Sequence, residues 1–195
     1  MNKTTKFLET AMLALVFAGL STAAMAQTTS LPTSRSMPVT GNVPALCSLG
    51  ANAGTGSFPL GVLIDTTTGK MRTGLSAPAQ SITGSWCNSP STISISATPL
   101  TSVNSIAVPP TGFSRTLNYT ATASGWTLAA SPASFTVGAA ANASASQAVT
   151  SAITGPISVA ISNIVPVGSD PFLVADTSYL GTITVTIAIA AASGT

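Results

Sequence analysis

The strongest alternation of apolar and polar residues lies near the carboxyl end, over residues 179–189 (YLGTITVTIAI). Four aliphatic side chains share one parity of this stretch: Ile183, Val185, Ile187 and Ile189. Because side chains of a strand alternate faces with a period of two, the pattern predicts a strand with one apolar and one threonine-rich face. Each aliphatic side chain contributes roughly 1.5–3 kcal/mol to stability when it is buried, so the strand is stable only if another part of the protein or a partner packs on its apolar face. Either the chain supplies that cover or a neighbour does.

Shorter alternating or apolar runs recur along the rest of the chain, separated by Gly- and Pro-rich turns such as residues 109–112. They predict strands at residues 39–47, 58–64, 81–87, 92–97, 115–122, 148–153, 157–165 and 172–174. The Ala- and Ser-rich stretch 138–146 has no amphipathic period, so we predict a loop there. A total of roughly eight to ten short strands without a helix is typical of a β-sandwich.

The amino-terminal 26 residues have the pattern of a secretory signal peptide. Lys3 and Lys6 precede an apolar run at residues 12–20, and Ala24-Met25-Ala26 forms a small-x-small cleavage site. The apolar run is shorter than the ~20 residues that a membrane-spanning helix needs, and no later run is long enough. We therefore expect a signal peptide at 1–26, an extended arm at 27–38 and one domain at 39–195, exported and without a membrane span in the mature chain.

The mature chain is almost uncharged. Arg35, Lys70, Arg72 and Arg115 stand against Asp65, Asp170 and Asp176, so four positive charges minus three negative ones leave +1. Nucleic-acid binding needs clustered Lys and Arg, which are missing, so no nucleic-acid partner is expected. A surface of Ser, Thr, Asn, Gly and Ala suits packing against copies of the same chain, and it equally suits a lightly charged secreted domain.

The two cysteines, Cys47 and Cys87, predict a disulfide, because an even number of cysteines in an exported protein is typical of one. Closing a loop of this length stabilises the fold by roughly 4 kcal/mol in the chain-entropy model. The alternatives are two free thiols or a metal site, and the metal site would be short of ligands because the chain has no histidine.

The residues for common catalytic chemistry are missing, so we expect neither an enzyme nor a cofactor or metal. Without histidine a Ser-His-Asp or Cys-His arrangement cannot form. Asp65 and Asp176 would serve as paired carboxylates only if the fold placed them across a cleft. Of the tryptophans, Trp86 beside Cys87 is predicted to fill the core, whereas Trp126 suits either the core or a binding rim.

A combination of features in a fixed order carries a family resemblance. A polar arm follows the signal peptide, Val39-Thr40-Gly41-Asn42-Val43 leads to Cys47, the second cysteine lies about 40 residues on, and the last strand has a Gly-Thr-(apolar)-Thr-(apolar)-Thr core. This arrangement resembles the pilin subunits of chaperone–usher fimbriae and the spore coat protein U-like domains. The resemblance covers both ends of the mature chain, and the middle matches only in the style of its strands.

The resemblance implies an immunoglobulin-like sandwich that lacks its last strand, with a groove lined by Ile183, Val185, Ile187 and Ile189. A periplasmic chaperone and an usher would handle the subunit, and the arm of the next subunit would then fill the groove by strand addition. In this chain the arm offers Leu31 and Met37 as its bulky apolar residues.

The expected function is therefore an exported structural subunit of a fimbria or surface coat, which passes from the periplasm to the cell surface. The alternative is a self-complete, secreted β-sandwich that binds a carbohydrate or a host surface.

Overall fold

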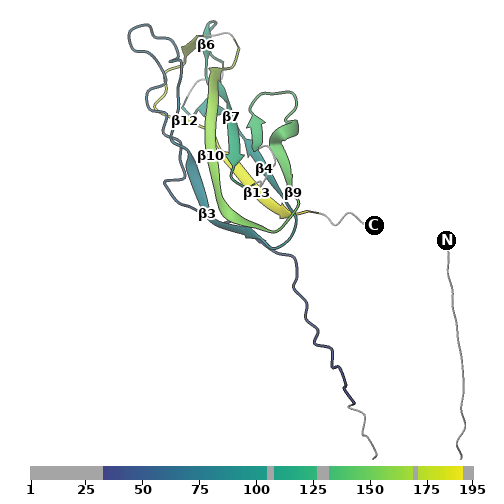
Figure 1. The fold of residues 1–195 in the computed structure, drawn as a ribbon. Helices are drawn as coiled ribbons and strands as arrows, with labels where there is room; N and C mark the ends of the chain where they lie inside the picture. The colour runs from purple at the N-terminus through teal and green to yellow at the C-terminus, as the bar shows by residue number, and fades with distance from the viewer. Residues whose placement is uncertain (1–32, 105–107, 127–131, 169–170, 191–195) are drawn as a thin grey trace, which may run out of the picture. The chain divides into compact units, whose positions relative to one another are not determined.

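The computed structural model describes residues 33–104, 108–126, 132–168 and 171–190. The chain divides into two units, Met1–Gly41 and Asn42–Thr195. In the first unit, residues 33–41 are exposed and belong to no helix or strand. The described part of the second unit is all-β with mainly antiparallel sheets, and its one helical turn is the 3-10 segment η1 (Ala143–Ala145) (Figure 1). The predicted fold class is confirmed at this level.

The larger sheet is antiparallel and is built around three long strands, β3 (Gln80–Cys87), β10 (Ile153–Pro166) and β7 (Thr116–Ser124). Its strand order is β1-β3-β10-β7-β5-β12. Outside this order, β2 also pairs with β3 and β8 also pairs with β7. The shorter members are β1 (Cys47–Ser48), β2 (Ala51–Asn52), β5 (Leu100–Ser102), β8 (Ala133–Thr136) and β12 (Tyr179–Leu180).

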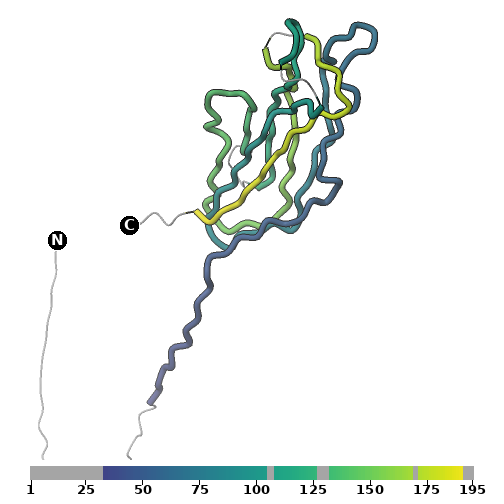
Figure 2. The backbone as a smooth tube through the Cα atoms, turned by 180° about the vertical axis from the view of Figure 1, so that it is seen from behind, coloured from purple at the N-terminus to yellow at the C-terminus, as the bar shows by residue number. Residues whose placement is uncertain are grey.

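The smaller sheet has the order β13-β4-β9, and both of its pairings are antiparallel. Its strands are β13 (Ile183–Ile189), β4 (Ser91–Ala97) and β9 (Ser146–Val149). A separate two-stranded parallel pair joins β6 (Phe113–Ser114) to β11 (Phe172–Leu173). Figure 2 shows β13 in yellow, running to the C-terminus along the smaller sheet.

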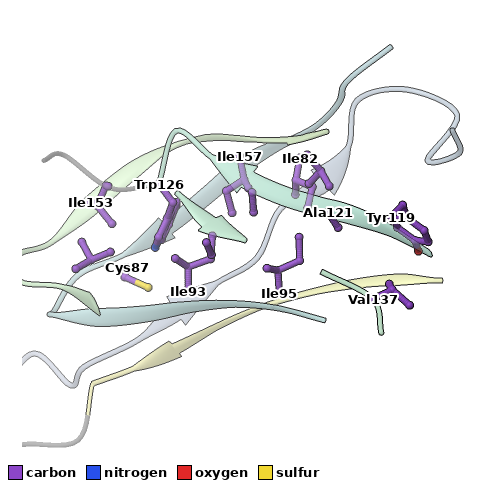
Figure 3. Close-up of a cluster of buried hydrophobic side chains, with 14 residues drawn as sticks. Ile82, Cys87, Ile93, Ile95, Tyr119, Ala121, Trp126, Val137, Ile153 and Ile157 are labelled. Atoms are coloured by element: carbon purple, nitrogen blue, oxygen red, sulfur yellow. The ribbon is translucent and has the colours of Figure 1, made fainter. Parts of the chain in front are cut away.

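The core lies between the two sheets. Ile93 and Ile95 of β4 point toward Ile157 and Trp126, which come from the side of the larger sheet (Figure 3). Ile93, Ile157 and Trp126 are fully buried. Burial at this level contributes roughly 1.5–3 kcal/mol for each aliphatic side chain, so this layer supplies much of the stability of the domain.

Several predicted strands are confirmed within a residue or two, and three are wrong. The predicted strand at residues 148–153 spans a connection, because β9 ends at Val149 and β10 begins at Ile153. Residues 58–64 are not a strand, because Pro59 lacks an amide hydrogen and Gly61 has φ of 68°, outside the range of a strand. In this stretch only Ile64 forms a bridge, to Met71. In the predicted strand at residues 39–47, only Cys47 is in a strand.

The two tryptophans have opposite environments. The prediction that Trp86 fills the core is wrong: its side chain is 39% exposed, because it lies between Ser85 and Cys87, whose side chains take the inward face of β3. Trp126 is fully buried, which settles its alternatives in favour of the core.

Candidate strand-binding groove along β13

In the described part of the chain, β13 pairs with β4 alone. The register runs from Ile183 opposite Ala97 to Ile189 opposite Ser91. At one end, the amide of Thr98 donates to the carbonyl of Thr182 (2.9 Å), and at the other the amide of Ala190 donates to the carbonyl of Pro90 (2.9 Å). Backbone groups of successive residues point to opposite sides of a strand. Even-numbered residues of β13 therefore face β4, and the N–H and C=O groups of odd-numbered residues face the other flank.

The side chains of the same odd-numbered residues face the core. Ile183, Val185 and Ile187 are half-buried and pack against the core cluster, while Thr184 and Thr186 are exposed. Ile189, at the end of the strand, is 45% exposed. The predicted alternation of faces is therefore present, with three aliphatic side chains only partly covered.

Two hollows lie beside this flank, and a third adjoins them. The first, about 600 Å³, is lined mainly by residues 58–64 and 173–179. The second, about 410 Å³, shares Phe58, Leu60 and Tyr179 with it and extends to Ile183. The third, about 280 Å³, shares Phe58 and Ile183 with the second and reaches Val185, Leu49 and Ile82. Because consecutive hollows share lining residues, we treat them as one depression, the β13 groove.

Two of the four predicted groove residues, Ile183 and Val185, line these hollows. Ile187 and Ile189 are not among the lining residues, and they continue the same face toward the end of β13. That all four contact a donor strand remains a prediction. Sequence reasoning missed the opposite wall at Phe58 and Leu60, because their apolar run was interpreted as a strand.

Asp176 is the single charged residue that lines the groove in the described part of the chain. Its carboxylate accepts the amides of Asn104 (2.7 Å) and Ser178 (3.0 Å) and the side-chain amide of Asn104 (2.9 Å). These bonds, the one from Ser178 first, lower the pKa of Asp176 from 3.8 to about 2. Asp65 is not among the lining residues, so the groove does not hold the two carboxylates as a pair.

Tyr179 closes the same end of the groove. Its hydroxyl donates to the carbonyl of Val174 (2.6 Å), and burial is the main cause that raises the pKa of its phenol. Together with the Asp176 bonds, this contact ties residues 174–179 to each other and to the loop at Asn104, so this end of the groove has a defined shape.

The predicted disulfide is confirmed between Cys47 and Cys87, and the residues just before Cys47 are held beside it. Asn88 extends the pairing of β1 with β3: its backbone amide donates to the carbonyl of Leu46 (3.0 Å), and its side chain accepts the amide of Leu46 (2.7 Å) and donates to the carbonyl of Pro44 (2.9 Å). The chain at residues 44–46 therefore continues the line of β1.

Of the two predicted donor residues, only Met37 lies in the described part of the chain. Leu31 lies outside the described residues. Met37 is 85% exposed, and Val39 nearby is 99% exposed.

Across the described ranges, no group of three or more His, Cys, Asp or Glu residues is placed to hold a metal ion. The same residues contain no helix that is long and apolar enough to cross a membrane. The site thus consists of the flank of β13 whose N–H and C=O groups face away from β4, together with a neighbouring apolar groove. Comparisons with protein-family models, curated proteins and solved structures found no match.

Proposed function

We propose that the protein is an exported structural subunit of a fimbria or surface coat, assembled by donor-strand exchange. The observation that carries the proposal is the flank of β13, where backbone groups and half-covered side chains of Ile183, Val185 and Ile187 lie beside an apolar groove. An edge strand of this kind is a template for another strand and a hazard if left uncovered. Adding a strand there would give it backbone hydrogen bonds and an apolar cover at once.

On this proposal the domain is an immunoglobulin-like sandwich that lacks its last strand. A periplasmic chaperone covers the groove first, an usher receives the subunit, and a copy or a related subunit then supplies the permanent strand at the cell surface. The donor is the arm that precedes the domain, with Leu31 and Met37 as its apolar residues.

The test compares two pairs of arm substitutions in the full-length chain, exported together with a periplasmic chaperone and an usher. Leu31→Asp with Met37→Asp places carboxylates at the apolar donor positions, and Ser30→Asp with Ser36→Asp adds the same charge at the other parity. We expect wild type and the Ser30/Ser36 variant to form polymers, seen as a ladder of bands in unboiled detergent gels that collapses to the monomer on boiling. The Leu31/Met37 variant should stay monomeric.

A monomeric wild-type chain that refolds alone would contradict the proposal. It would favour the alternative, a self-complete secreted β-sandwich that binds a carbohydrate or a host surface.

A further inference from the structure

The prolines of the arm share one parity. Pro32 and Pro38 are even-numbered, whereas the apolar residues Leu31 and Met37 are odd-numbered. Proline has no amide hydrogen to give to a sheet. In an extended arm, the odd-numbered residues therefore keep every N–H, and the even-numbered residues lose one at each proline.

The pairing geometry of β13 requires this parity from its occupant. Ile183, Val185 and Ile187 direct their backbone groups to the open flank and their side chains to the core. In an antiparallel pair, directly opposed residues have side chains on the same face, and hydrogen-bonded opposed residues exchange both of their bonds. Residues of the occupant that bond to β13 must therefore have an N–H and must also point their side chains toward the core. The odd-numbered residues of the arm meet both conditions.

Charge indicates which end of the groove each part of the arm reaches. Arg35 is the single charged residue between Gln27 and Leu46, and it belongs to the odd-numbered set. Among the described residues, Asp176 is the single charged one that lines the groove, at the end beside Tyr179. Two other cations lie near that end: the guanidinium of Arg72 donates to the carbonyl of Val62 (3.4 Å), and Arg115 interacts electrostatically with Tyr179.

From these observations we propose a register for the donor arm, and this inference rests on the proposed function. The arm of a second copy lies antiparallel to β13, with its odd-numbered residues bonded to that strand and its prolines turned to the opposite rim. Arg35 lies level with Gly181 and reaches Asp176, so Leu31 falls opposite Val185. Gln27, the first residue after the predicted cleavage site, then falls opposite Ile189, so the length of the arm matches the strand.

The test moves one proline by one residue in the full-length chain. Thr33→Pro removes an N–H that the register gives to β13, and Ser34→Pro removes one that faces the opposite rim, where Pro32 and Pro38 already lack theirs. We expect Ser34→Pro to form ladders like wild type and Thr33→Pro to lose them. Equal ladders from the two variants, or loss in Ser34→Pro alone, would overturn the register and leave the proposed function standing.

A second measurement isolates the hydrogen bond from other effects of proline. A synthetic peptide of residues 27–39 is titrated into the monomeric Leu31→Asp, Met37→Asp chain, whose own arm competes poorly. N-methylation at Thr33 should raise the dissociation constant by about two- to tenfold, the value of one hydrogen bond, and N-methylation at Ser34 should leave it unchanged. Equal dissociation constants for the peptides methylated at Thr33 and at Ser34 would overturn the register. If the unmodified peptide fails to bind, the proposed function itself is contradicted.

The same titration tests Arg35. In the peptide, Arg35→Lys should bind like wild type, whereas Arg35→Glu should bind more weakly, with a difference that shrinks as salt is added. Equal affinity of the two peptides at low salt would refute the placement of Arg35 beside Asp176.

Discussion

Val185→Asp tests most directly which face of β13 packs on the core. Val185 is half-buried, opposes the buried Ile95 of β4 and lines the groove, whereas its neighbour Thr186 is exposed and opposes Ser94. Removing the valine forfeits most of its burial, about 1–2 kcal/mol, and the new carboxylate meets a partly apolar wall at a cost of about 1–2 kcal/mol. We expect a total loss of about 2–4 kcal/mol.

That loss is a large part of the 5–15 kcal/mol that is typical of a domain. For a chain of this size it corresponds to a fall in Tm of about 5–15 °C. Thr186→Asp adds the same charge on the outward face, and it should stay within about 0.5 kcal/mol of wild type. The measurement is urea and thermal unfolding of the two variants side by side. Equal stability of the two would refute the assignment of the core-facing side of β13, and wild-type ladder formation by Val185→Asp would refute the role of that face in assembly.

Three further predictions concern the body of the domain. Replacing Cys47 and Cys87 by Ala should lower the free energy of unfolding by about 4 kcal/mol, as a shift of the urea midpoint that a reductant reproduces in wild type. Gly50→Ala should destabilise by at least ~2 kcal/mol in the same assay, because a Cβ there overlaps the carbonyl of Thr83, while Gly41→Ala, with no atom within 4 Å of its Cβ, should be neutral. The pKa of Asp176 is depressed in the folded chain, so its contribution to stability is present above pH 4 and is lost as the pH falls through about 2. Asp176→Asn should flatten that part of the pH profile, and an unchanged profile would contradict the role of the carboxylate.

The alternating strands could be predicted from the sequence because their pattern is local. The run at residues 92–97 gives β4, and residues 179–189 contain β12 and β13, with Ile183 and Val185 on the predicted face. The same reasoning failed at Phe58 and Leu60, because apolar content favours burial in any conformation. Pro59 and the left-handed Gly61 make that stretch a loop that becomes a wall of the groove.

Contacts between residues far apart in the chain had no local signal. Nothing near Asn88 in the sequence indicates that its side chain holds Pro44 and Leu46, and Asp176 gives no hint of its partner Asn104, 72 residues away. Trp86 was misplaced because its position beside Cys87 suggested burial, whereas Ser85 and Cys87 take the inward face at this end of β3. The period alone, counted from the buried Ile82, would also have placed Trp86 on the inward face. The irregularity at Gly84, which has φ of 79°, moves the inward face to the odd-numbered residues that follow it.

Amide hydrogen exchange along β13 tests the central claim most directly, because it reports which backbone groups have partners. In the monomeric chain we expect alternation: slow exchange at Thr184 and Thr186, whose amides face β4, and fast exchange at Ile183, Val185 and Ile187. Adding the peptide of residues 27–39 should slow the three fast amides selectively. Slow exchange of all five amides in the monomer, with no change on adding the peptide, would mean that the strand already has a partner on each side and would contradict the account.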